Sequence, residues 1–302
     1  MKKNIKNILS FLLLTPFLSS CANNNNIKTP FLLSDSFSDV LESQGIFNAV
    51  LVWPISKLIN LFSIKFGVFL GITIVTLIIN IIISLIMFKV NKTIQMVQII
   101  QPEILLIEEK YKGKKSEKAQ LDLTNELQNV YIKYGVRPLI VMLFSFIQIP
   151  ILLAMYFAVQ KSKGLYELSF CGSSIISTPR DAFSRGPIIY IFIFILMIVS
   201  QIVSVIMPLL LEKRRAKKRE KTGIREIDDP IQKSPFTAYG TVVLLSFLMF
   251  DWPFALTIYY LIVSIFECIK TIVFNSLAEN EYKRINDKWF LEKKKKMLNR
   301  NI

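Results

Sequence analysis

The sequence predicts an all-α integral membrane protein with five transmembrane helices and a cytoplasmic helical hairpin. Of the 302 residues, 52% are hydrophobic, the mean hydropathy is +0.46 and only 10 are glycine. Five apolar segments recur along the chain, and positive charge is concentrated in the loops on one side of them. This composition and charge distribution are typical of helical membrane proteins rather than of soluble globular proteins.

The N-terminus has the features of a bacterial signal peptide. Three lysines precede a short apolar stretch, and small residues lead to Cys21. We therefore predict a signal peptide over residues 1–20. Its end resembles a lipobox, which predicts that Cys21 is lipidated and that residues 21–50 form an extracytoplasmic tether. An uncleaved anchor with a chance cysteine is the alternative.

The apolar segments define the expected spans. They lie at about 66–88, 138–159, 188–211, 236–250 and 254–274. The fourth segment is short for a crossing of ~20 residues. Because Asp251 and Pro253 separate it from the fifth, we expect a tight helical hairpin there. Residues 52–66 are predicted to lie on the outer membrane surface as a short helix, with Trp53 at the depth of the interface.

Basic residues indicate which loops face the cell interior. If Cys21 lies outside, the first span runs inward and the loops alternate. The predicted inner segments (91–137, 212–235 and 275–302) carry 25 Lys and Arg, against 7 in the predicted outer segments (22–66 and 160–187). This distribution follows the positive-inside rule and places the C-terminus in the cytoplasm.

The inner loop at 91–137 is predicted to form the cytoplasmic hairpin. Residues 92–111 and 117–134 have helical periodicity, and a Gly- and Lys-rich break separates them. The basic start of the next inner loop predicts an extension of the third span. Residues 276–302 are predicted as a basic cytoplasmic tail.

One side of the first span is polar. Thr73, Thr76, Asn80 and Ser84 are spaced by three, four and four residues, which places them within an arc of about 80°. Such an arc is costly in lipid unless it faces protein or water. The alternative is that Thr and Ser satisfy their own helix backbone and that Asn80 bonds a neighbouring helix.

The last span carries a second polar arc. Its members are Thr257, Tyr260, Ser264, Glu267 and Thr271. Two polar arcs on separate spans predict a shared hydrated surface at membrane depth. Gln148 and Gln201 either add to that surface or only link helices. Glu267 and Lys270 are expected to pair with each other or to extend toward the headgroups.

Candidate catalytic and metal-binding groups are scarce. The chain has no His, and Cys21, Cys171 and Cys268 lie far apart in the sequence. This argues against a zinc site and a disulfide framework. With no phosphate-binding loop or nucleophile motif in the sequence, we predict no catalytic residues, no metal, no cofactor and no enzymatic activity.

Several strings resemble one family. Residues 96–103 and 131–138 resemble the two ends of the cytoplasmic hairpin of the YidC membrane insertases, the bacterial branch of the Oxa-type superfamily. Residues 148–150 resemble the family's Gln-x-Pro, and residues 252–264 resemble its Tyr-rich last span. The resemblance covers roughly residues 51–275.

The resemblance implies a five-helix insertase core at 51–275 around a polar intramembrane groove, open to the cytoplasm and the lipid. Such proteins assist the insertion and folding of new membrane proteins in the bacterial plasma membrane, alone or beside the Sec translocon. The candidate groove residues are Thr73, Thr76, Asn80, Ser84, Gln148, Gln201, Thr257, Tyr259, Tyr260 and Ser264. Asn80 stands where most bacterial members have an arginine, and it offers a neutral donor and acceptor instead of a cation.

The expected partners are nascent membrane proteins and membrane lipids, with no DNA. The lysine cluster at 293–296 could bind ribosomal RNA, or equally anionic lipid. Two other functions are compatible with polar residues in the membrane: a small-solute transporter or channel, and a lipid-anchored structural partner of another complex.

Overall fold

The computed structural model describes residues 31, 35–114, 116–137, 148–162, 165, 168–221 and 235–298. Within these residues the chain is almost entirely helical, which confirms the all-α prediction. The elements are α2 (Phe37–Phe47), the π-helical η1 (Asn48–Val52), α3 (Trp53–Phe66), α4 (Val68–Ile86), α5 (Phe88–Tyr111), α6 (Glu117–Lys133), α8 (Gln148–Lys161), β1 (Ser169–Phe170), β2 (Ser173–Ser174), α10 (Pro179–Arg185), α11 (Ile188–Lys221), α12 (Pro235–Phe250) and α13 (Phe254–Leu298).

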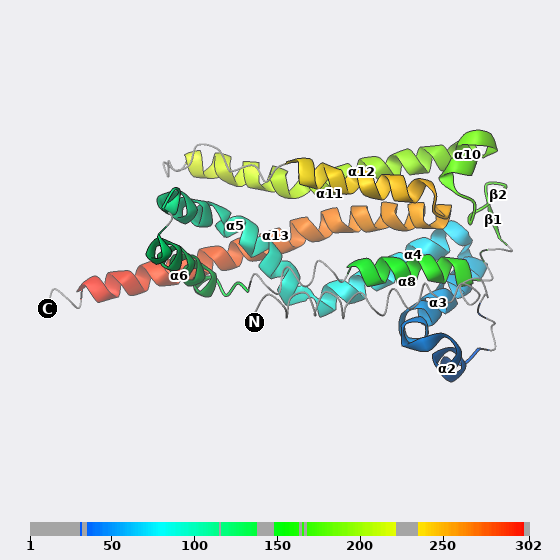
Figure 1. The fold of residues 1–302 in the computed structure, drawn as a ribbon, viewed down its shortest axis with the longest axis horizontal. Helices are drawn as coiled ribbons and strands as arrows, with labels where there is room; N and C mark the ends of the chain where they lie inside the picture. The colour runs from blue at the N-terminus through cyan, green and yellow to red at the C-terminus, as the bar shows by residue number, and fades with distance from the viewer. Residues whose placement is uncertain are drawn as a thin grey trace.

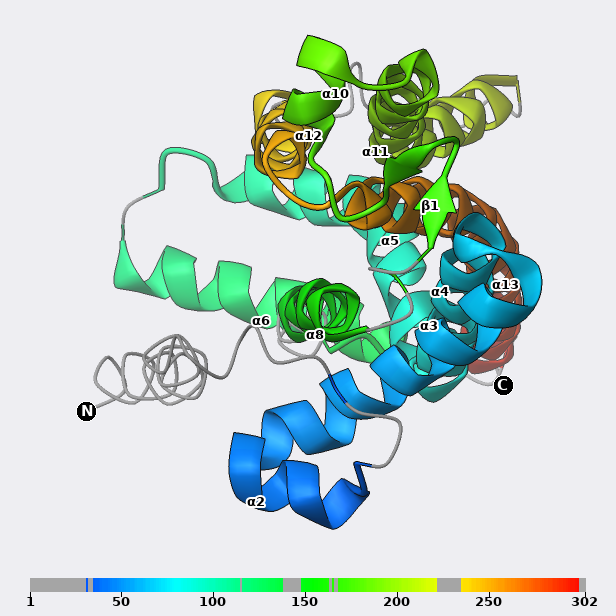
Figure 2. The same cartoon turned by 90° about the vertical axis from the view of Figure 1, so that its right-hand side faces the viewer.

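The helices form an elongated bundle (Figure 1). We call the end that carries β1, β2 and α10 the β end, and the end that carries α5 and α6 the hairpin end. Figure 2 views the β end and shows α11 and α12 on one side, α8 on the other, and α3 and α4 beside the start of α13. α13 is the central helix, since it contacts α4, α5, α8, α11 and α12.

Four helical stretches of the described chain are long and apolar enough to cross a membrane. They are Phe37–Phe66, Val68–Ile86, Ile188–Arg215 and Phe254–Asp287. The last three coincide with predicted spans. The span predicted at 138–159 is described only from Gln148, as the apolar helix α8, and the span predicted at 236–250 corresponds to the 16-residue α12. The total of five spans therefore stays a prediction.

The last part of the predicted tether at 21–50 is helical from Phe37, and the tether itself stays a prediction. Ser36 and Asp39 form a capping box: each side chain accepts a hydrogen bond from the backbone N–H of the other. Val40 and Ala49 are buried against the bundle. A capped start and an apolar side stabilise this helix, whereas the tether prediction rested on the asparagine-rich residues before it.

α3 and α4 form a close helical pair. Gly67 ends α3 with φ +84°, a conformation that glycine adopts without strain. The chain then turns so that Gly71 of α4 lies against the backbone of Ser63 in α3, leaving no room for a Cβ.

The hairpin prediction and the helix extensions can be compared directly with the structure. α5 and α6 occupy the two stretches with helical periodicity in 91–137, and α11 continues past its apolar part to Lys221. α13 has 45 residues and continues through the predicted tail to Leu298. The tail is therefore a continuation of the last apolar helix as far as that residue.

Candidate functional site

The polar side of α4 faces the interior of the bundle. Thr76 is fully buried, Asn80 is 9% exposed, and Thr73 and Ser84 are partly buried. The opposite side of the same helix exposes large apolar side chains, including Ile82 and Leu85. This orientation follows from the packing of α13 against α4.

Much of this polar side is satisfied within the helix. Thr73 Oγ1 donates to Phe69 O at 2.8 Å and Thr76 Oγ1 donates to Ile72 O at 2.7 Å. These are the local bonds that the alternative interpretation expects of threonine. Asn80 Nδ2 also donates to its own helix, to Thr76 O at 2.8 Å. The amide keeps its carbonyl oxygen as an acceptor.

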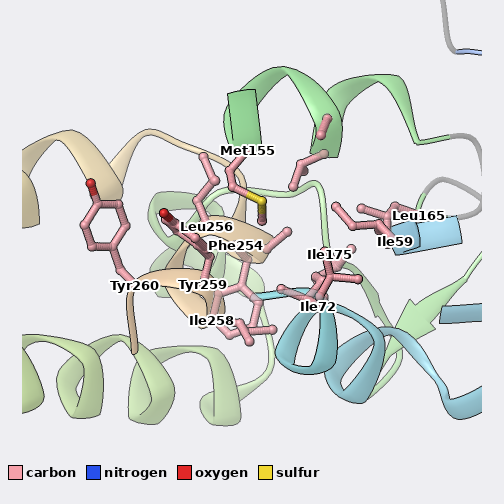
Figure 3. Close-up of a cluster of buried hydrophobic side chains, with 14 of the residues drawn as sticks. Ile59, Ile72, Met155, Leu165, Ile175, Phe254, Leu256, Ile258, Tyr259 and Tyr260 are labelled. Carbon is pink, nitrogen blue, oxygen red and sulfur yellow. The ribbon is translucent and has the colours of Figure 1, made fainter. Parts of the chain in front are cut away.

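The candidate residues of α13 are more deeply buried. Thr257 and Tyr259 are fully buried and Tyr260 nearly so, with the two tyrosine rings 5.3 Å apart and almost perpendicular. Figure 3 shows Tyr260 projecting from α13 beside the apolar cluster. In the part of the chain that the structure describes, Thr257 Oγ1 has no hydrogen-bond partner.

Ser264 links two helices. Its hydroxyl lies 2.6 Å from Ser200 Oγ of α11 and within 2.8 Å of Tyr260 O in its own helix. Ser200 was not among the predicted groove residues, although Ser200 and Ser204 are spaced by one helical turn on α11. Toward the hairpin end, Lys270 donates to Glu267, so these two residues pair as expected.

Gln201 is the most unusual candidate residue. Gln201 is only 5% exposed, and neither its Oε1 nor its Nε2 has a hydrogen-bond partner among the described residues. Buried polar groups are normally hydrogen-bonded, and leaving one unpaired costs ~1–3 kcal/mol. An amide in this position is therefore suited to bind water or a polar group of a ligand.

Asn80 and Gln201 lie at similar depth. α4, α11 and α13 all run from the β end to the hairpin end (Figure 1), and Ile72 and Ile258 share one apolar cluster. At 1.5 Å per residue, Asn80 lies about 12 Å beyond Ile72, and Ser264 lies about 9 Å beyond Ile258. Gln201 is next to the residue of α11 that bonds Ser264. The two amides therefore lie at comparable levels on helices that both pack against α13.

The β end is closed by packed loops and aromatic rings. The rings of Tyr190 and Phe254 stack at 3.8 Å. Phe254 N donates to Ser177 O at 2.9 Å. Arg180 Nε lies 2.8 Å from Asp251 Oδ1, and Arg180 Nη2 donates to Asp251 Oδ2 at 3.0 Å. Figure 3 shows the apolar side chains from α3, α4, α8 and α13 that fill this end of the bundle.

Two predicted residues are not described at the level of their side chains. Cys21 lies outside the described residues. Gln148 begins α8, but its side chain is likewise outside the description. Cys171 and Cys268 are free thiols. In the described ranges, no three metal-binding side chains lie together.

Comparisons with known proteins identify relatives of this chain. A family model described as "60Kd inner membrane protein" matches residues 59–281. Membrane protein insertase YidC 2 of Bacillus anthracis is 33% identical over 172 residues, covering 56% of this chain and 63% of that protein. Membrane protein insertase YidC 1 of Halalkalibacterium halodurans is 35% identical over 133 residues, covering 43% and 51%.

Membrane protein insertase MisCA of Bacillus subtilis is 29% identical over 172 residues, covering 56% of this chain and 61% of that protein. The chain thus spans between about half and just under two thirds of the length of these relatives.

Proposed function

Since the chain belongs to the 60Kd inner membrane protein family, the family of the YidC insertases, we propose that it helps newly made membrane proteins to insert and fold in a bacterial plasma membrane. The observation that carries the proposal is Gln201, a buried amide with no partner in the described part of a membrane-embedded bundle. Asn80, whose amide nitrogen donates to Thr76 O, lies at similar depth.

The proposed site lowers the cost of moving a polar segment into the membrane. A charged residue at the centre of a membrane helix costs ~2.5–3.5 kcal/mol on insertion scales. Amides and hydroxyls at that depth, with the water they retain, replace part of the lost hydration. The apolar part of the substrate then moves into lipid, which releases ~0.8 kcal/mol per buried CH₂ group. No step requires a catalytic residue or a cofactor.

The proposed orientation places the β end outside the cell and the hairpin end in the cytoplasm. It is supported by the excess of Lys and Arg in the segments at the hairpin end, and the packed β end would then close the site toward the outside. Lipidation of Cys21, cooperation with the Sec translocon and ribosome binding through the basic tail belong to the same proposal.

Photo-crosslinking tests the proposal. A photoreactive amino acid at position 80 is expected to capture a stalled nascent membrane protein. The matched control is position 82, which lies about 200° around the same helix and exposes its side chain; it should capture much less. Equal capture at both positions would contradict a site at Asn80. Solute uptake by the purified protein in liposomes, without capture of a nascent chain, would favour a transporter instead.

A further inference from the structure

A second apolar cluster lies at the hairpin end, outside the proposed site. It contains Met96, Ile100, Ile104, Tyr134 and Val136 from the hairpin, and Tyr282 and Ile285 of α13 pack against it. Three chain segments therefore meet here: α5, the end of α6 and the part of α13 beyond the predicted last span.

Glu103 lies at the centre of this contact. Its Oε1 accepts a hydrogen bond from Tyr134 OH at 2.6 Å and another from Tyr282 OH at 3.1 Å. The two tyrosine rings stack at 5.3 Å, with 16° between their planes. One carboxylate oxygen thus joins all three segments.

Neighbouring groups support the same arrangement. Tyr134 OH also lies 2.9 Å from Asn286 Oδ1. Because a phenol has one proton, it donates to Glu103 or to Asn286 at any instant. Burial, and secondarily the hydrogen bond to Glu103, raises the pKa of Tyr134 above its ordinary value, so this phenol stays protonated and remains a donor at neutral pH.

Ion pairs flank the centre. Lys133 Nζ lies 3.7 Å from Glu103 Oε2, and Lys92 Nζ lies 2.5 Å from Glu281 Oε2. Their side chains are partly exposed, and ion pairs of that kind contribute little individually. The hydrogen bonds that the buried Tyr134 and the partly buried Tyr282 donate to Glu103 are directional, and they therefore define how the hairpin sits on α13.

We propose that Glu103, Tyr134 and Tyr282 form a latch that holds the hairpin on α13, so that the hairpin and the tail helix move as one body. α13 is uninterrupted from Phe254 at the β end to Leu298. A ligand that displaces the tail therefore displaces the hairpin, and a ligand on the hairpin acts on the tail. We expect this contact between the hairpin and α13 regardless of which substrate the protein inserts or transports.

Distance measurements between spin labels test the latch. The labels are placed by Gln120→Cys on α6 and Lys283→Cys on α13, both at exposed positions, in the full chain without its native cysteines and in lipid nanodiscs. The parent should give one narrow distance distribution. Glu103→Gln, which weakens the acceptor, and Tyr282→Phe, which removes a donor, should each broaden it and add longer distances. Combined, they should broaden it by less than the sum of the two single effects, because both substitutions act on the bond between Tyr282 and Glu103.

The matched control is Glu109→Gln, an exposed glutamate on the same helix; it should leave the distribution narrow. A second label pair at the β end, Glu42→Cys with Ser184→Cys, reports on the fold and should not change. Narrow distances in both latch variants, or equal broadening in the control, would overturn the proposal. So would broadening of both label pairs, because the effect would then be general unfolding.

Discussion

Gln201 and Thr257 bring unpaired polar atoms into a largely apolar interior, and nothing in the described packing compensates for them. Leu or Val would fill such positions without the desolvation cost. The proposed site at these residues and Asn80 contains amides and hydroxyls but no charge. If a substrate binds there, we expect polar segments of either sign to be accepted, without strong selection on their charge.

Replacing Gln201 by Leu tests two things separately: whether the buried amide lowers stability, and whether insertion requires it. Because the amide is buried without a described partner, Gln201→Leu should keep or raise the melting temperature, by the equivalent of ~1 kcal/mol. Insertion of a reporter membrane protein into proteoliposomes should fall, because the polar group proposed to receive the substrate is gone.

Gln95→Leu is the control. Gln95 also has a buried side-chain oxygen without a partner in the described chain, but it lies in α5, outside the site. Its replacement should be tolerated with insertion unchanged. A marked fall in the melting temperature of Gln201→Leu would show instead that the amide is a structural partner.

At the scale of single residues, spacing predicted which side of α4 and α13 is polar, but not how each group is satisfied. Thr76 and Asn80 fall on the predicted side, yet their donors turn back to the helix backbone. Ser264 was predicted as a groove residue, which stays a prediction; its hydroxyl also links two helices through Ser200. Such partners depend on the rotation of neighbouring helices, which a single sequence does not define.

At the scale of elements, the pair α3 and α4 depends on a close approach of the two helix backbones. A Cβ on Gly71 would lie 2.6 Å from Ser63 N and 2.7 Å from Ser63 Cα. Gly71→Ala must push the helices apart, so we expect a loss of ~1–3 kcal/mol of stability, measured as a lower melting temperature in detergent.

Gly240→Ala is the matched control for this substitution. Gly240 also lies in an apolar helix, but a Cβ there meets nothing within 4 Å. Because alanine has a higher helix propensity, by up to ~1 kcal/mol, this variant should be neutral or more stable. Equal destabilisation of both variants would mean that backbone contact at Gly71 is not the cause.

Long apolar periodic segments were the most predictable elements. α4, α11 and the apolar part of α13 lie where hydropathy indicated, and the break before Glu117 separates α5 from α6 as expected. The helix α2 and the strands β1 and β2 were not predicted, because each is short and depends on contacts at the β end. Tyr190, for example, donates to Phe170 O and lies 3.1 Å from Ser173 O, which holds the strand pair on α11.

For the whole molecule, the difference between the two ends predicts from which end water reaches the proposed site. The β end is filled by stacked rings and bonded loops, and it is clamped by Arg180 and Asp251. The hairpin is instead joined to α13 through Glu103 and two tyrosines, of which Tyr134 is buried and Tyr282 partly buried. If the site at Asn80 is hydrated, its water should come from the hairpin end.

Thiol labelling in oriented vesicles measures this access. In a chain without native cysteines, Asn80→Cys should react with a membrane-impermeant thiol reagent added from the hairpin side and not from the β side, because the stacked Tyr190 and Phe254 block the latter. Lys114→Cys and Ser184→Cys, at exposed positions near the two ends, show that each side is reachable. Labelling of position 80 from the β side alone would reverse the proposed opening. If position 80 is labelled from neither side although both end positions are labelled, the site is not hydrated. The polar side of α4 would then have only a role in packing.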